Sequence, residues 1–317
     1  MTQWIPNLWV PVQVQWIFGG ILGLLGLASV IVWLMRRGDS AGKHAELAAR
    51  VQSWWWMVAI FAVAIAIRRD VAIGFFAFLS FLALKEYLSL IPTRRADRRV
   101  LFWVYLAVPL QYWWIGQAWY HMFLVFIPVW CFLFVPMRMV LQGETKDFLR
   151  AVGTLHWGLM TMVFALSHLA YLLVLPEGSA VHAHGAALLL FVVLLTELND
   201  VLQYVWGRTL GRRKVIETVS PKKTVAGLLG GALSTTLVAF LLAPVLTPLT
   251  PNHAIAVGLM IGFGGFVGDV TISALKRDLG IKDTGSIIPG HGGILDRIDS
   301  LLFTAPLYFH FLKYFYF

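Results

Sequence analysis

Carboxylates, cations and glycines are concentrated in residues 268–300 of a chain that is otherwise mostly hydrophobic. This stretch reads GDVTISALKRDLGIKDTGSIIPGHGGILDRIDS. Ionisable groups are costly beside lipid, so a cluster of them in such a chain indicates a functional site. Carboxylates bind hard divalent cations, whereas basic side chains and glycine backbone amides suit phosphate. The combination indicates a site for a metal-bound phosphate compound.

The first part of this stretch predicts a helix with one polar face. Asp269, Ser273 and Lys276 are spaced i, i+4 and i+7, and therefore share a face. Arg277 lies next to that face. A purely structural Asp–Lys pair between two helices is the alternative interpretation.

A glycine-rich turn, residues 289–293, precedes two further carboxylates. Its glycines, which would let backbone amides approach a phosphate, are Gly290, Gly292 and Gly293. Asp296 and Asp299 are three residues apart on one face of the next helix, and such a pair suits Mg²⁺ or Mn²⁺. His291 is a candidate phosphate contact or acid–base group, although a lone histidine is more often structural.

A second candidate phosphate site lies upstream, where a helix is expected to begin. Its lysines and hydroxyls are Ser220, Lys222, Lys223 and Thr224. A helix N-terminus favours anions, so this group is well placed for a triphosphate. Membrane-anchoring positive charge is the alternative, and we prefer it for Arg212, Arg213 and Lys214.

The composition indicates an integral membrane protein. Of the 317 residues, 59% are hydrophobic and only 13% are charged, against about 25% in soluble domains. The net charge of +9 fits basic cytoplasmic loops better than nucleic-acid binding. Cys131 is the only cysteine, which excludes an intrachain disulfide and a zinc site built from cysteines.

Apolar stretches predict an all-α, polytopic membrane helix bundle with nine to ten transmembrane helices. The expected spans are 16–35, 51–67, 71–91, 100–115, 120–137, 152–175, 185–206, 224–248, 254–275 and 300–317. The fourth is short, and the aromatic-rich last one is expected to lie partly in the interface.

Alternate loops carry most of the 25 lysines and arginines, which predicts an external N-terminus and places the polar segments in the cytoplasm. We divide the chain into two regions. Residues 1–180 are expected to form a scaffold, a lipid-access route or a dimer interface, and residues 181–317 the catalytic region.

At these residues the chain resembles the phosphatidate cytidylyltransferase family, also called CDP-diacylglycerol synthases. The family pattern S-x-x-K-R-x-x-x-x-K-D, then P-G-H-G-G-x-x-D-R-x-D, is complete here. It is formed by Ser273, Lys276, Arg277, Lys282, Asp283, residues 289–293, Asp296, Arg297 and Asp299. A weaker match upstream includes Asp200 and Tyr204. The resemblance is sharp over the C-terminal third of the chain and only hydropathic elsewhere.

The resemblance implies that CTP and phosphatidate react to give CDP-diacylglycerol and pyrophosphate at the cytoplasmic face. One or two Mg²⁺ ions, or Mn²⁺, would be held by Asp269, Asp296 and Asp299. Basic residues would neutralise phosphate charge; they are Lys222, Lys223, Lys276 and Arg277. A multi-pass protein of the bacterial inner membrane is the simplest expectation, and a homodimer is compatible with the family.

The chain departs from the family pattern where Val225 and Ala226 replace the usual Trp and Glu. This departure keeps open a CTP-dependent transferase that acts on another lipid phosphate or on a polyprenol. A non-enzymatic lipid transporter is a further alternative. The clustering of charge near one membrane face and the lack of an inverted repeat argue against it.

Overall fold

A computed structural model describes residues 9–37, 45–175, 184–285 and 292–317. Over these residues the chain is mainly helical, and an isolated β-bridge joins Lys214 and Thr224. The expectation of an all-α membrane helix bundle is confirmed.

Each of the ten expected spans corresponds to a helical segment within the described residues. The long helices are α1 (Val12–Arg37), α2 (Ala45–Ile67), α3 (Arg69–Leu90), α4 (Arg98–Gly116), α9 (Gly185–Leu210), α10 (Val225–Leu246), α11 (Pro251–Asp278) and α13 (Leu301–Tyr316). Two further spans are interrupted by π-helical turns: α5 (Tyr120–Val125), η2 (Phe126–Cys131) and α6 (Phe132–Val140), then α7 (Phe148–Gly158), η3 (Leu159–Ala165) and α8 (Leu166–Leu172). The short helices are η1 (Arg95–Asp97) and α12 (Leu295–Ile298).

Eight helical segments in the described part of the chain are long and apolar enough to cross a membrane, and α4 and α13 are not among them. Helix α13 has 16 residues, about 24 Å at 1.5 Å per residue, which is shorter than a hydrocarbon core of about 30 Å. Helix α4 starts with Arg98 and Arg99 and contains Gln111. The chain is an integral membrane protein, and these two helices have the weakest spanning character, as expected for the fourth and last spans.

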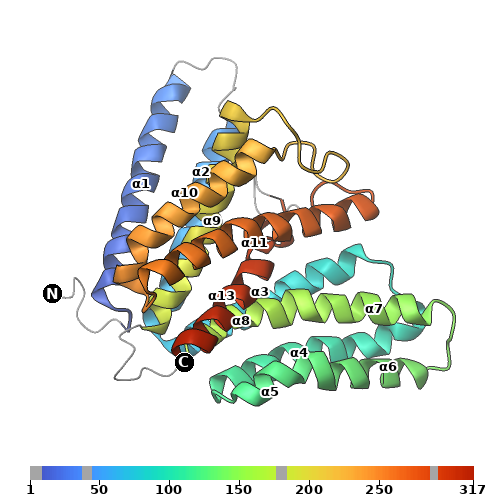
Figure 1. Cartoon of the computed structure of the whole chain (residues 1–317). Coiled ribbons are helices and arrows are strands. Elements are labelled where there is room, and N and C mark those ends of the chain that lie inside the picture. The colour runs from blue at the N-terminus through green and yellow to red at the C-terminus, as the bar shows by residue number, and fades with distance from the viewer. Residues whose placement is uncertain (1–8, 38–44, 176–183, 286–291) are drawn as a thin grey trace.

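Outward-facing apolar side chains on the outer helices match a lipid environment. Leu24 on α1 is 69% exposed, and Leu233 on α10 is 65% exposed. Figure 1 shows α1 at one edge of the molecule, where such residues would meet lipid.

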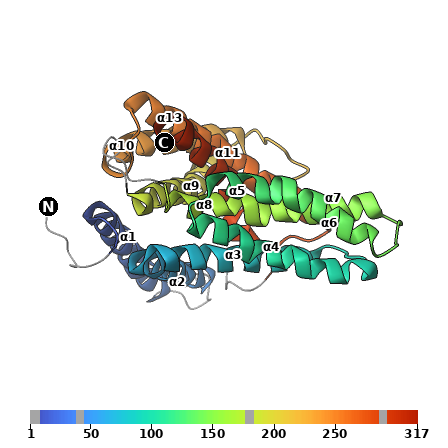
Figure 2. The same cartoon turned by 90° about the horizontal axis from the view of Figure 1, so that it is seen from below.

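The helices form three layers, which are seen edge-on in Figure 2. Helices α10, α11 and α13 form one layer, α8 and α9 lie next to it, and α2 and α3 belong to the third. Small residues allow close packing: a side chain at Gly262 on α11 would strike Ala232 on α10. The core continues across residue 180, because α13 packs against α8 as well as α9 and α11.

Two features position the polar segments at one end of the bundle. The loop between α9 and α10 and the C-terminal end of α11 lie at the right of Figure 1, whereas the start of α1 and the C-terminus lie at the lower left and bottom. Helix α3 also contacts α12, so the N-terminal half reaches the polar segment that follows α11.

The predicted orientation can be tested by cysteine labelling in a Cys131→Ser background. Gln117 lies between α4 and α5 and Thr145 between α6 and α7, and both are exposed. A membrane-impermeant maleimide should label Gln117→Cys in intact cells, and Thr145→Cys only after permeabilisation. The reverse pattern would contradict the external N-terminus.

Candidate active site

A cavity of about 1060 Å³ lies at the polar end of the bundle, between α9, α11 and the segments around α12. Predicted site residues that line it are Asp200, Tyr204, Ser220, Lys222, Lys223, Thr224, Asp269, Lys276, Lys282, Asp283, Gly292, Asp296, Arg297 and Asp299. Altogether eight basic and six acidic side chains contribute to the described lining. A site with both signs of charge can hold a polyanion together with a cation.

Lys223 joins three elements at the centre of the cavity. Its Nζ lies 2.6 Å from Asp269 Oδ2 on α11 and donates to Gln203 Oε1 on α9 at 3.2 Å. Ser273, one turn after Asp269, donates to Asp269 Oδ1 at 3.2 Å. Burial lowers the pKa of Lys223, but the carboxylates of Asp269 and Asp200 outweigh it and raise the pKa above its ordinary value. The lysine therefore stays protonated at neutral pH.

The loop that carries Lys223 is fixed by its own backbone. Val215 N donates to Lys223 O at 3.2 Å, and Val225 N donates to Arg213 O at 2.9 Å. Thr224 caps α10, since its hydroxyl accepts from Gly227 N at 3.1 Å. Helix α10 begins at Val225, close to the start of the span expected over 224–248, and Lys222 and Lys223 before it line the cavity.

Three carboxylates from α9, α11 and the α12–α13 junction line the same cavity: Asp200, Asp269 and Asp299. Asp299 is only 9% exposed, and its Oδ1 accepts from Ser300 N at 2.7 Å. Asp200 accepts from Ser300 Oγ at 3.1 and 2.9 Å. Burial, followed by the charges of Asp269 and Asp200, raises the pKa of Asp299 well above its ordinary value.

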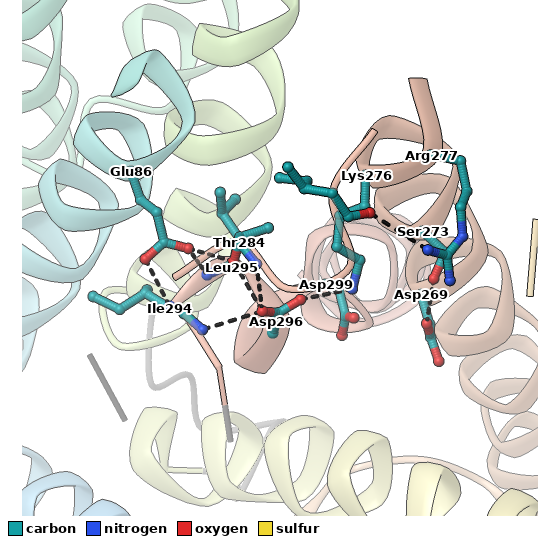
Figure 3. Close-up of polar contacts among 12 residues, drawn as sticks. Glu86, Asp269, Ser273, Lys276, Arg277, Thr284, Ile294, Leu295, Asp296 and Asp299 are labelled. Carbon is teal, nitrogen blue, oxygen red and sulfur yellow. Dashed lines mark hydrogen bonds and ion pairs between the residues drawn. The ribbon is translucent and has the colours of Figure 1, made fainter. Parts of the chain in front are cut away.

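Asp296 belongs to a separate network, shown in Figure 3. Its Oδ1 accepts from Lys276 Nζ at 2.6 Å, and its Oδ2 accepts from Thr284 N at 2.9 Å and Gly293 N at 3.1 Å. Burial raises the pKa of Asp296, but the hydrogen bonds from Lys276 and Thr284 outweigh it and hold the pKa below its ordinary value. Asp296 is therefore ionised, and both of its oxygens accept hydrogen bonds.

Within the described residues, no group of three or more His, Cys, Asp or Glu side chains is arranged to hold a metal ion. The expected metal ligands Asp269 and Asp299 do come together, but with Asp200. The third expected ligand, Asp296, is hydrogen-bonded to Lys276.

Some predicted site residues lie elsewhere. Ser273, Arg277 and Gly293 do not belong to the described cavity lining. Arg277 instead donates to the backbone carbonyls of Val219 at 3.3 Å and Ile281 at 3.4 Å, which ties the α9–α10 loop to the end of α11. Gly290 and His291 lie outside the described residues.

The cavity also contains residues that the sequence interpretation missed. Arg50 and Trp54 of α2, Glu197 of α9 and Lys214 line it. The interpretation of Lys214 as a membrane anchor is therefore incomplete. An acidic residue within an expected span is itself a signal of function, and Glu197 fits that signal.

Glycine at position 268 is required by the packing around Asp299. A Cβ atom there would strike the backbone carbonyl of Asp299, and it would lie 3.0 Å from Ser300 Cα. The absence of a side chain thus brings α11 against the α12–α13 junction and places Asp269 beside Asp299.

Residues 48–315 match the model of a family described as the cytidylyltransferase family. The chain belongs to the cytidylyltransferase family. The resemblance inferred from the motif is confirmed, because the match covers most of the chain and relatives carry the name phosphatidate cytidylyltransferase.

Relatives of this cytidylyltransferase fall into two groups. "Uncharacterized protein YnbB" of Escherichia coli (strain K12) is 45% identical over 294 residues, which cover 93% of this chain and 96% of that protein. A phosphatidate cytidylyltransferase of Synechocystis sp. is 47% identical over 114 residues, 36% of this chain and 39% of that protein. One from Staphylococcus saprophyticus is 38% identical over 131 residues, 39% and 48% of the two chains. The chain therefore matches less than half the length of these two named enzymes.

A pair of glycine substitutions tests the packing that positions Asp269. Gly268→Ala should reduce turnover at least about tenfold, because a small displacement of catalytic groups is costly. Gly74→Ala on α3 is the matched control, since a Cβ there meets nothing within 4 Å. Equal turnover of the two purified variants, measured as nucleotide transfer, would contradict this role of Gly268.

Proposed function

We propose that this cytidylyltransferase moves CMP from CTP to phosphatidate, giving CDP-diacylglycerol and pyrophosphate at the cytoplasmic face of the membrane. The observation that carries the proposal is a cavity at the polar end of a membrane bundle that is lined by both carboxylates and basic side chains. Membership of the family and the names of the partial relatives support CTP and a lipid phosphate as substrates.

The main physical task is to bring two polyanions together. Lys222, Lys223 and Lys276 would neutralise phosphate charge, together with Arg297, which also lines the cavity. Lys222 and Lys223 directly precede the Thr224 cap of α10, so the helix N-terminus adds to their attraction for a triphosphate. Arg277 would act indirectly, by holding the α9–α10 loop through Val219.

The reaction would be a direct transfer at phosphorus. An oxygen of the phosphatidate phosphate attacks the α-phosphorus of CTP and forms the new P–O bond. The bond between the α-phosphorus and the oxygen bridging to the β-phosphate breaks, and pyrophosphate leaves with that electron pair. A phosphate monoester is already an adequate nucleophile near neutral pH, so we assign no general base. Alignment and charge neutralisation are the contributions expected of the protein.

The carboxylates suit a hard divalent cation. Asp299 is buried and lines the same cavity as Asp269 and Asp200. Carboxylate oxygens are the donors that Mg²⁺ or Mn²⁺ prefers, although the described side chains are not grouped around one point. We propose Asp269, Asp296 and Asp299 as ligands of one or two ions, with Asp200 as an additional carboxylate beside them. A bound ion would supply positive charge that stabilises the pyrophosphate leaving group. Lys276 would hold Asp296 in place at that edge of the site.

The lipid would approach from the membrane side of the same cavity. Trp54, Val201 and Leu228 contribute apolar lining, and Tyr204 is 62% exposed. Acyl chains can remain among lipids while the head group enters the charged part. This arrangement fits a multi-pass protein of the bacterial inner membrane, which we propose as its location. We further propose that residues 1–180 serve as scaffold and lipid access for the catalytic region 181–317.

Another lipid phosphate or a polyprenol is the second candidate acceptor. Val225 and Ala226 directly follow Thr224, which lines the cavity, and they replace residues usual in the family motif. A change next to the cavity can alter acceptor choice without altering the carboxylates. Family membership favours an enzyme that acts on either kind of acceptor over a non-enzymatic lipid transporter.

A panel of acceptors separates the two candidates. The purified protein would be incubated with labelled CTP and Mg²⁺ together with phosphatidate, other lipid phosphates or a polyprenol. Phosphatidate should give the highest kcat/KM. A higher value for another acceptor would replace phosphatidate in the proposal.

Neutral substitutions test the carboxylates. Asp296→Asn and Asp299→Asn should each lower kcat by at least about a hundredfold, because each removes a charge that acts on the transition state. Asp70→Asn is the control, because this exposed aspartate pairs only with neighbouring arginines at the α2–α3 turn. Pyrophosphate release and the melting temperature in detergent would be measured. Wild-type turnover in both folded site variants would refute the metal assignment.

A further inference from the structure

Glu86 is a buried carboxylate on α3 that reaches from the N-terminal half into the segment around α12. The side chain is only 7% exposed. Its Oε1 accepts from Thr284 Oγ1 at 2.6 Å and from Leu295 N at 3.1 Å, and its Oε2 accepts from Ile294 N at 2.9 Å. Figure 3 shows these three bonds converging on one carboxylate.

The groups held by Glu86 are the same ones that surround Asp296. The Thr284 hydroxyl oxygen lies 2.6 Å from Glu86 Oε1 and 2.9 Å from Asp296 Oδ2, so it bridges the two carboxylates. The amide of Thr284 donates to Asp296, and Leu295 directly precedes Asp296 in the chain. Glu86 therefore restrains the two segments that position Asp296, which are Thr284 and residues 294–295.

The space between these segments is closed to any further side chain. A Cβ atom at Gly293 would strike both the Glu86 carboxylate and the Thr284 hydroxyl. The glycine thus lets Glu86 approach closely enough to bind the next two amides, those of Ile294 and Leu295.

We propose that Glu86 is a positioning residue for transfer at this site. Its carboxylate holds Thr284 and residues 294–295 so that Asp296, with Lys276 bound to it, faces the cavity. Glu86 itself does not belong to the described cavity lining, so it acts through Asp296 rather than on substrate. The activity readouts of this proposal rest on the proposed function.

A carboxylate holds Thr284 and residues 294–295 in place better than an apolar side chain would. It accepts three hydrogen bonds at once, and bonds to a charged acceptor are about twice as strong as neutral ones. Functional groups must be held to within about 0.5 Å, a tolerance that fixed hydrogen bonds around them can provide. Loss of the charge should therefore reduce turnover more than it reduces substrate binding.

The first variant is Glu86→Gln, which keeps the shape but replaces one acceptor oxygen with an amide donor that faces another donor. We expect kcat to fall about 10- to 100-fold, while the KM for CTP changes less than about threefold because the cavity cations are untouched. Lys85→Gln is the matched control: Lys85 is the exposed neighbour on the same helix and should retain wild-type kcat. Wild-type kcat in Glu86→Gln would overturn the proposal, as would equal changes in kcat and KM.

Thr284 supplies a second, milder pair of variants. Thr284→Val removes only the bridging hydroxyl and keeps the backbone amide, so kcat should fall by less than in Glu86→Gln. Thr284→Ser restores the hydroxyl and should recover most of the activity. If Glu86→Gln does not fold, the Thr284→Val and Thr284→Ser variants test the proposal instead. Equal kcat in these two variants would overturn it.

Hydrogen exchange gives a readout that needs no substrate. The amides of Ile294 and Leu295 should exchange more slowly in the wild-type protein than in Glu86→Gln, with the rest of α3 unchanged. Unchanged exchange at these amides would overturn the proposal. Wild-type protein that transfers no CMP, but still shows the exchange difference, would refute the proposed function while leaving the role of Glu86 in place.

Discussion

The negative charge of the buried carboxylates must be balanced by cations or hydrogen-bond donors. This requirement determines how side chains are arranged at the polar end of the bundle. A charge removed from water is tolerated only when cations or hydrogen-bond donors replace its hydration. Asp269 has Lys223 at 2.6 Å, and Asp296 has Lys276 at 2.6 Å together with two backbone amides. Asp299 instead accepts from the backbone amide of Ser300, and it is buried in the cavity that Asp200 and Asp269 also line. This local excess of negative charge is the physical reason to propose a divalent cation there.

The helical scaffold serves to bring these groups together from distant parts of the chain. Asp200, Asp269 and Asp299 come from α9, α11 and the α12–α13 junction, and close helix contacts bring these elements together. Gly268 allows α11 to meet the junction, and the Thr224 cap begins α10 directly after Lys223. Glu86 extends the same arrangement to α3. The N-terminal half is thereby connected to the site by a specific polar contact as well as by apolar packing.

The amino-acid sequence predicted the parts of the structure that depend on local pattern. Long apolar runs predicted the helical segments of the ten expected spans, including a start for α10 close to residue 224. Motif spacing predicted which charged residues line the cavity, including Lys223 and Asp283. The pairing of those charges depends on tertiary contacts instead. Spacing alone predicted that Asp296 and Asp299 would act as a pair. In the fold, Asp296 is hydrogen-bonded to Lys276, and the carboxylate of Asp200 acts on Asp299 instead.

Glu86 shows the same limit most clearly. It is separated by 208 residues from Ile294, to which it is bonded, so no local pattern connects the two. Its only signal in the sequence was an ionisable group within an expected span, and that signal does not identify a partner. Lys214 is similar, because a basic residue in a loop between two spans is interpreted as a membrane anchor until the fold places it in a cavity.

The most direct measurement compares CTP labelled at the α-phosphorus with CTP labelled at the γ-phosphorus, using purified protein, phosphatidate and Mg²⁺, with an EDTA control. The account predicts that α-label enters the lipid as CDP-diacylglycerol, that γ-label leaves as pyrophosphate, and that EDTA abolishes both. Transfer of γ-label to the lipid would contradict it, because that outcome requires attack at the other end of the triphosphate. Failure to label phosphatidate at all would contradict the acceptor.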